Sequence, residues 1–185
     1  MKCYHCKKKA IVQYTQALCR KCFLKLLEAR VRKYVRINKF FNKNDIILVI
    51  DPLSKFLLKK IIGGLPVKIY YRKIKILNLD KIKGYINDKK IKKIVIPWTI
   101  DDECCFFLEK LFQNKSIKKN TYISLLQVMT DDEAISFAKF NKIAFSPNKK
   151  DQEIKNMLDI LEKKYPETKY SFIKSIAETR KILNK

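Results

Sequence analysis

The sequence predicts an α/β fold built around a parallel β-sheet. Short continuous apolar runs at 46–50 and 94–96 have the pattern of strands that are buried on both faces. They alternate with segments of about 10–15 residues whose apolar side chains recur at helical spacing. The chain has 185 residues, of which 47% are apolar, so it can fill the core of one domain, or of a smaller domain with an appendage. This apolar content excludes disorder despite the high charge.

The N-terminal segments differ from each other in pattern. Residues 1–22 are rich in cysteine and show no helical periodicity, whereas residues 23–41 predict an amphipathic helix. The apolar side of this helix carries Phe23, Leu27, Val31, Tyr34, Val35 and Phe41. The opposite side carries Lys25, Arg32, Lys33, Arg36 and Lys39. The buried strand at 46–50 follows Asn44-Asp45.

The segments between residues 54 and 96 alternate between helical and extended patterns. In chain order they are a helix at 54–62 ended by Gly63-Gly64, a strand at 67–71, a short strand at 74–77, a helix at 79–92 that Gly84 weakens, and a strand at 94–96 stopped by Pro97.

The remaining segments predict helices with recognisable N-termini. Thr99 with Asp102 starts one, and Thr130 with Glu133 forms a capping box for another that runs to residue 140. The apolar side of the first consists of Cys104, Cys105, Leu108, Leu111 and Phe112. The other predicted elements are a strand at 121–127 and helices at 151–164 and 168–183, with Pro166 between the two helices.

The charge points to a polyanionic partner. The chain carries 42 Lys and Arg against 18 Asp and Glu, a net charge of +24, and its pI is about 9.8, which is most often a signature of nucleic-acid binding. A basic surface without such a partner is the alternative, because AT-rich genomes and thermophiles both enrich lysine and isoleucine. Only three glycines are present, which argues against a phosphate-binding loop.

The cysteines and the N-terminus indicate a reducing compartment. Residues 1–20 have lysines between cysteines and no apolar segment of a secretory leader. No apolar run approaches the length needed to span a membrane. We therefore expect a cytoplasmic protein without membrane contact, in which paired cysteines more often bind metal than form disulfides.

Two CxxC knuckles predict a metal site. Cys3-x2-Cys6 and Cys19-x2-Cys22 present four thiolates, a set that suits tetrahedral Zn in a structural zinc ribbon. Two disulfides or free thiols are the alternatives, and His5 is a further candidate ligand. The basic residues around the knuckles are Lys7, Lys8, Lys9, Arg20 and Lys21. They suit contact with phosphates, although a solvated face would have the same composition.

The order of these features resembles the tRNA 2-thiolation proteins of the ATP-pyrophosphatase, or PP-loop, superfamily. That family opens with a four-cysteine ribbon, a basic helix such as Glu28–Lys33, and an apolar strand. Ile100–Glu103 is similar to its Leu-Asp-Asp-Glu motif, and Thr130–Ala138 to its Glu-x-Glu-x-x-x-Tyr-Ala type of segment. Residues 153–176 resemble its closing helices. The resemblance implies a Rossmann-like parallel sheet of the PP-loop, or adenine nucleotide alpha hydrolase, type.

The chain departs from that family at the catalytic motifs. The family's Ser-Gly-Gly-Lys-Asp-Ser loop, which holds ATP phosphates, is replaced by Asp51-Pro52-Leu53-Ser54-Lys55-Phe56. Proline has no N–H, leucine is bulky, and an aspartate would repel an anion, so we expect no ATP binding. The family's CxxC before the Asp-Asp motif is missing, and its later Cys-Pro is Ser146-Pro147. We therefore expect no iron–sulfur cluster and no catalysis.

The other candidate groups have a structural and a functional interpretation. Cys104 and Cys105 are about 100° apart on a helix and follow three acidic residues, so buried packing is favoured over a reactive thiolate. Asp101 and Asp102 suit helix capping, or Mg²⁺ binding in an intact enzyme. Trp98 suits packing at a strand end, or stacking on a base.

The resemblance thus implies an inactive, archaeal partner subunit of tRNA wobble-uridine 2-thiolation. It would comprise a zinc ribbon at 1–22, a basic linking helix at 23–44 and a degenerate PP-loop domain at 45–185, and it would bind tRNA and an intact PP-loop thiolase. A stand-alone zinc-ribbon RNA-binding protein, for example one associated with ribosomes, is the alternative. An active sulfurtransferase that uses Cys104 or Cys105 is the third hypothesis.

Overall fold

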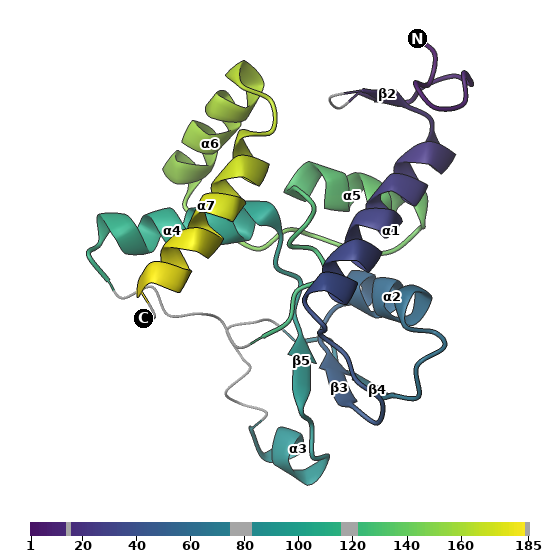
Figure 1. Ribbon diagram of the computed structural model, residues 1–185, viewed down its shortest axis with the longest axis vertical. Coiled ribbons are helices and arrows are strands. Elements are labelled where there is room, and N and C mark those ends of the chain that lie inside the picture. The colour runs from purple at the N-terminus through teal and green to yellow at the C-terminus, as the bar shows by residue number, and fades with distance from the viewer. Residues whose placement is uncertain (14–15, 75–82, 116–121, 184–185) are drawn as a thin grey trace.

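The computed structural model describes residues 1–13, 16–74, 83–115 and 122–183, which form a central sheet surrounded by helices (Figure 1). In chain order, the elements are β1 (Val12–Gln13), β2 (Ala17–Leu18), α1 (Arg20–Ile37), β3 (Ile46–Val49), α2 (Pro52–Ile61), β4 (Lys68–Tyr71), α3 (Lys83–Asp88), β5 (Lys93–Val95), α4 (Ile100–Phe112), α5 (Asp131–Phe140), α6 (Gln152–Lys164) and α7 (Thr168–Leu183).

The central sheet is parallel, as the sequence predicts. Its strand order is β4-β3-β5, and Leu48 of β3 pairs with Tyr70 on one side and with Ile94 on the other. The central strand is sealed from solvent, since Ile47, Leu48 and Val49 are all 0% exposed. Burial on both faces explains why this strand has an unbroken apolar run instead of an alternating pattern.

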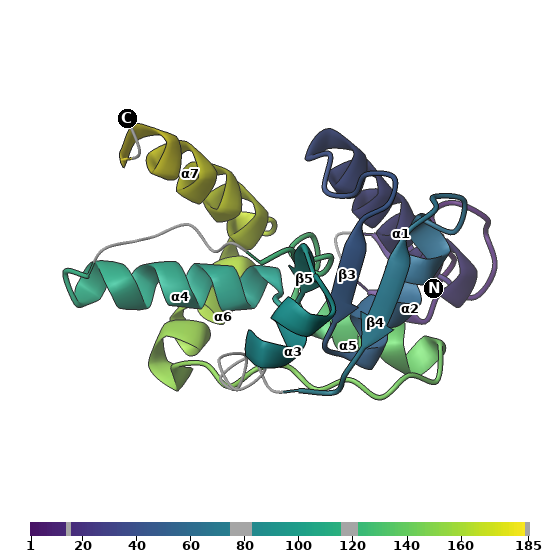
Figure 2. The same ribbon diagram turned by 90° about the horizontal axis from the view of Figure 1, so that it is seen from below.

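Helices cover the sheet in separate layers. Side chains of a strand alternate between faces, so Ile47 and Val49 pack against α1, α2 and α5 while Leu48 packs on the opposite side near α3. Helices α4, α6 and α7 form a third group with its own apolar cluster, which includes Cys104 and Leu158. Figure 2 shows α1 and α7 on either side of β5.

The helix starts follow local capping chemistry. The predicted capping box of Thr130 and Glu133 is present at α5, and the predicted helix start at Thr99 is also a capping box, closed by Asp102 at α4. Helix α1 begins at Arg20, earlier than predicted, and ends at Ile37, before Lys39 adopts a left-handed φ of 49°. Helices α6 and α7 lie within the predicted ranges.

Two expectations for the region after residue 100 are wrong. Residues 122–127 form only an isolated parallel bridge between Val95 and Ile123 instead of a strand. The chain turns there because Ser124 Oγ donates to Trp98 O and accepts from Leu126 N–H, and the consecutive Leu125 and Leu126 are both buried. Leu111 and Phe112 do not belong to the buried side of α4, since they are 51% and 64% exposed at its C-terminal end.

The predicted helix at 79–92 is shorter in the part that the structure describes, where α3 spans Lys83–Asp88. Most of the predicted strand at 74–77 lies outside the described residues. Among the helices of the described ranges, none combines the length and apolarity needed to cross a bilayer.

Candidate functional site

The four N-terminal cysteines converge on one point. The Sγ atoms of Cys3, Cys6, Cys19 and Cys22 all lie within 4.8 Å of one another. Those of Cys6 and Cys19 are 3.5 Å apart, close to the separation of about 3.8 Å between two thiolates of a tetrahedral zinc site. A disulfide would need about 2.05 Å. The arrangement therefore suits a single metal ion with four sulfur ligands.

The two knuckles are held by different elements. In the first, Cys3 N–H donates to Lys8 O at 2.7 Å and Lys7 N–H donates to Cys3 O at 3.0 Å, with a left-handed φ of 59° at Lys7. In the second, Cys19 is the N-cap of α1 and Cys22 lies in its first turn. The longest helix of the described chain thus begins in the metal centre.

The charge state of these thiols also favours a cation. Hydrogen bonds from backbone N–H groups, the strongest from Cys19, lower the pKa of Cys3 to about 6. The pKa of Cys19 is lowered mainly by the backbone of Cys22. Hydrogen bonding with Cys6 and burial raise the pKa of Cys22 to about 12. Four thiolates together therefore require a bound positive ion.

All nine residues predicted to contact nucleic acid are exposed: Lys7, Lys8, Lys9, Arg20, Lys21, Arg32, Lys33, Arg36 and Lys39. Two of them are partly held by the protein, because Arg20 donates to Phe140 O and Arg32 donates to Lys60 O at 3.2 Å. None of the nine forms an ion pair with a carboxylate of the described residues. Their charges therefore remain available to an anionic partner.

The charge is concentrated in the N-terminal half of the sequence. Residues 1–98 contain 26 Lys and Arg against 5 Asp and Glu, a net charge of +21. Residues 99–185 contain 16 against 13, a net charge of +3. The metal centre, α1, α2 and the sheet thus form the electropositive part of the molecule.

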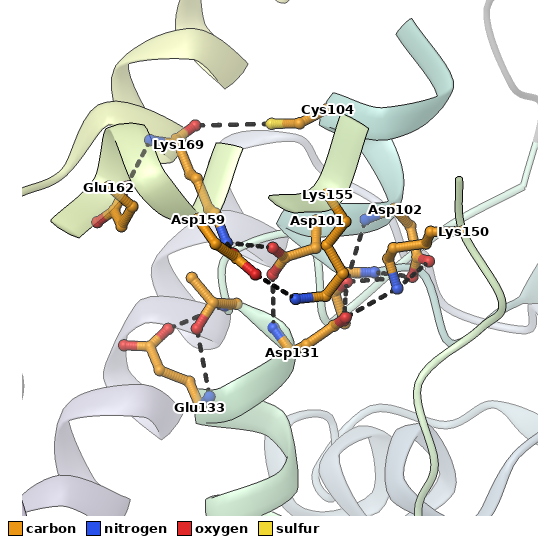
Figure 3. Close-up of polar contacts among 12 residues, drawn as sticks. Asp101, Asp102, Cys104, Asp131, Glu133, Lys150, Lys155, Asp159, Glu162 and Lys169 are labelled. Carbon is orange, nitrogen blue, oxygen red and sulfur yellow. Dashed lines mark hydrogen bonds and ion pairs between the residues drawn. The ribbon is translucent and has the colours of Figure 1, made fainter. Parts of the chain in front are cut away.

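A buried ion network joins the C-terminal helices (Figure 3). Lys150 Nζ lies 2.7 Å from a carboxylate oxygen of Asp102 and 2.9 Å from one of Asp131. Lys169 Nζ pairs with Asp101 and lies 2.5 Å from Asp159. The side chains of both lysines are at most 6% exposed.

The acidic residues at the starts of α4 and α5 have structural roles in this network. Asp102 accepts from the N–H of Thr99, the N-cap of α4, at 2.8 Å, and Asp131 N–H at the start of α5 donates to Asp101 Oδ2 at 2.7 Å. Burial raises the pKa of Asp131. Burial alone would lower the pKa of Lys150, but the nearby carboxylates of Asp102 and Asp131 outweigh it and raise that pKa. The two ammonium groups thus occupy the space between the carboxylates, where a divalent cation would otherwise balance their charge.

The turn after β3 has no phosphate-binding loop. Helix α2 starts at Pro52, directly after its N-cap Asp51, whose Oδ1 accepts from Ser54 N–H at 2.8 Å. Leu53 is 0% exposed, and Lys55 Nζ lies 4.1 Å from the centre of the Tyr71 ring. The first N–H groups of this helix are therefore either absent or directed at the protein's own carboxylate.

Asp51 is expected to limit the stability of this turn at neutral pH. Burial raises its pKa, and its Oδ2 has no partner in the described structure. A raised folded-state pKa means that stability falls as pH rises above the usual 3.8. Asp51→Asn keeps the N-cap but cannot ionise. Its unfolding temperature should therefore fall less than that of the wild type between about pH 4 and pH 7. The matched Asp51→Ala should lose about 1 kcal/mol from the missing cap. Equal pH dependence in the wild type and Asp51→Asn would contradict this assignment.

The two remaining thiols are buried in α4. Cys104 is 0% and Cys105 is 1% exposed. Burial, reinforced by Asp101, raises the pKa of both, to about 12 for Cys105. These properties are the opposite of those that make a cysteine nucleophilic.

The similarity of this chain to known proteins lies in its fold. No family model and no curated protein matches it. Among solved structures, it matches the U34-tRNA thiolase NcsA from Methanococcus maripaludis, solved with its 4Fe-4S cluster, at a TM-score of 0.73. The match covers 97% of this chain and 87% of the thiolase. This chain has the fold of the thiolase. The identity is 16%, so the likeness to NcsA shows the fold alone.

The NcsA-like fold confirms the fold class that the sequence predicts, and the four cysteines meet as one cluster. That the exposed basic residues bind RNA stays a prediction. Sequence reasoning missed Lys150 and Lys169 because lysine is frequent throughout the chain, and nothing near either residue marks it as buried.

Proposed function

We propose that this protein is a non-catalytic, tRNA-binding partner subunit in wobble-uridine 2-thiolation that acts with a catalytically intact PP-loop thiolase. The observation that carries the proposal is the turn between β3 and α2, in a chain that has the fold of a U34-tRNA thiolase. The family resembled here uses this turn to hold ATP phosphates. In this protein, Asp51 caps the helix itself, Pro52 supplies no N–H, and burial of Leu53 leaves no glycine-lined space.

The sulfur chemistry supports the same proposal. The position of the family's later cysteine is Ser146, and Cys104 and Cys105 have raised pKa values in an apolar cluster. Neither Cys104 nor Cys105 is therefore ready to accept or transfer sulfur, and no set of cysteines outside residues 3–22 suits an iron–sulfur cluster. The active-sulfurtransferase hypothesis predicts the opposite properties for these thiols.

The proposed RNA-binding surface is the metal module together with the exposed face of α1. We assign Zn²⁺ to the four cysteines because two knuckles with tetrahedral spacing suit a structural zinc ion and leave no open coordination position. Lysines and arginines on this surface would contact phosphates and position the RNA without reading its sequence. The proposal places the complex in the cytoplasm, where free thiolates persist.

Purification of the tagged full-length protein from its native cells tests the proposal. We expect a stable complex with an intact PP-loop thiolase, and thiolated tRNA formed by that complex but not by this chain alone with ATP and a sulfur donor. Recovery of only ribosomes or bulk RNA would favour the stand-alone RNA-binding protein instead. Thiolated product from the isolated chain that is lost in Cys105→Ser would establish the sulfurtransferase.

Charge reversal on α1 should weaken tRNA binding. In Arg32→Glu/Arg36→Glu, we expect the affinity to fall by at least tenfold and the slope of log affinity against log salt to decrease in magnitude by about two, because two phosphate contacts are lost. Binding is measured by fluorescence anisotropy of labelled tRNA at several salt concentrations.

The matched control for that pair is Lys163→Glu/Lys174→Glu, which makes the same change in net charge at exposed positions of α6 and α7. Its affinity should change much less. Equal losses in the two double variants would mean that only the total charge matters and that the face of α1 is not the binding surface.

A further inference from the structure

A small cavity lies between α1, α4, α7 and the segment that follows β5, separate from the metal centre and from the ion network. Its volume is about 140 Å³, well below the 300–1,000 Å³ of pockets that hold drug-sized ligands. The space therefore suits one planar ring rather than a whole nucleotide. Figure 2 shows α1 and α7 on either side of β5, and the cavity is lined by residues of α1 and α7 and by Ile96 and Trp98, which follow β5.

The cavity has aromatic walls. Tyr34 of α1, Trp98 after the carboxyl end of β5, and Tyr122 each contribute a ring, and all three are only partly buried. Trp98 is fixed in place because its Nε1–H donates to Glu103 Oε2 at 2.8 Å and its ring packs edge-on against Phe106. Fixed aromatic rings at a partly open cavity are the means by which proteins hold unstacked bases.

The same cavity presents donors and acceptors side by side. The Tyr34 hydroxyl donates to Gln127 Oε1 at 2.7 Å, which leaves the amide N–H₂ of Gln127 as a donor. Asn38 Nδ2 donates to Tyr34 O at 2.9 Å, which leaves the Asn38 carbonyl oxygen as an acceptor. Both side chains line the cavity, and a donor next to an acceptor is what the edge of a nucleobase requires.

The charges of the cavity exclude a phosphate as its ligand. Glu103 and Arg180 both line it, and they form an ion pair with each other, so they add no net charge. No lysine lies on its wall. A neutral heterocycle fits this environment, while the phosphates of the same nucleic acid would lie outside, on the basic side of the molecule.

We propose that this cavity binds a single unpaired nucleobase of RNA, stacked against the aromatic rings and hydrogen-bonded by Gln127 and Asn38. The inference rests on the proposed tRNA-binding function and deepens it. Phosphate contacts on α1 would supply affinity without sequence preference, whereas the cavity selects RNA that exposes a base. Fully paired RNA cannot fill it, because its bases remain stacked in the helix.

The protein carries its own probe for the test, since Trp98 is the only tryptophan in the chain. The full-length protein is titrated with two RNA hairpins that share one stem, of which one carries a single bulged nucleotide. We expect the bulged hairpin to quench indole fluorescence and to bind about tenfold more tightly than the paired one. Trp98→Phe should abolish the optical signal in both titrations.

Gln127→Leu supplies the specificity test, and Gln113→Leu, the same substitution at an exposed residue at the end of α4, is its control. By anisotropy of labelled RNA, Gln127→Leu should remove most of the preference for the bulged hairpin, while Gln113→Leu should keep it. Equal affinity and equal quenching for both hairpins, or identical behaviour of the two variants, would overturn the proposal.

A titration with the nucleosides uridine and cytidine separates this inference from the proposed function. Quenching by a nucleoside that is lost in Gln127→Leu, in a protein that does not bind tRNA, would support the cavity and overturn the function. Tight, salt-sensitive tRNA binding with no preference for an unpaired base would support the proposed function and overturn the role of the cavity.

Discussion

Substitution of Cys19 by serine is expected to release the metal and unfold the N-terminal module. The side chain of Cys19 makes no capping hydrogen bond to α1, and serine is a good N-cap, so the substitution removes the metal ligand without removing a cap. The module has little apolar core of its own, so metal binding supplies much of its folding free energy. Elemental analysis should find about one zinc per chain in the wild type and far less in the variant. Amide resonances of residues 1–13 should lose their dispersion, while those of the sheet persist.

Cys105→Ser is the matched control, because it changes a buried cysteine outside the metal centre. It should lower stability without changing the zinc content. A metal-free wild type that is fully folded would contradict the metal site itself. Iron in place of zinc, with the absorption of an iron–sulfur cluster, would keep the site and correct the assignment of its metal.

Removal of Lys169 is expected to be the most destabilising single change in the C-terminal helices. Lys169→Met leaves the Asp101 carboxylate, 1% exposed, without its buried counter-charge. Loss of one partner from a buried ion pair costs about 3–5 kcal/mol, which is a large share of the total stability of a typical domain. Thermal or urea unfolding of the two proteins measures the difference.

Two further variants separate the ion network from simple packing. Lys155→Met removes a partly exposed ion pair with Asp159, whose side chains are 25% and 35% exposed, and should cost less than about 1 kcal/mol. Lys169→Met/Asp101→Asn removes both charges and should recover part of the loss. If the single and double variants were equally unstable, the role of Lys169 would be packing rather than charge.

The pH dependence gives an independent check on Lys169. Burial lowers its pKa, but the carboxylates of Asp101 and Asp159 outweigh burial and raise the pKa above the usual 10.5. The stabilisation is therefore fully present below pH 10.5 and is lost as the pH rises beyond it. The free energy of unfolding of Lys169→Met should therefore fall less than that of the wild type as the pH rises above 10.5.

Features that depend on neighbouring residues could be predicted from the sequence. The capping boxes at Thr99 and Thr130 are local, because each side chain bonds a backbone group three residues away. The strand at 46–50 was visible because a strand covered on both faces is apolar throughout. The cysteine cluster was visible because its two knuckles have regular spacing.

Features made by distant residues could not be predicted. Residues 121–127 have strand-forming composition, but the bonds of Ser124 to Trp98 turn the chain there. Lys150 pairs with Asp102, 48 residues earlier in the chain. In a sequence with 42 Lys and Arg, no neighbouring residue distinguishes this lysine from the exposed ones. The cavity beside Trp98 is lined from several separate segments, so no short motif marks it.

Helix α1 begins at the metal centre and reaches the aromatic cavity. Cys19 is its N-cap, and Tyr34 and Asn38 at its other end line the cavity. At a rise of 1.5 Å per residue, Cys19 and Asn38 lie about 28 Å apart along the axis of α1. Under the proposed function, an RNA that contacts both sites would have to bridge this length, so selection among RNAs would depend on their dimensions, independently of their sequence.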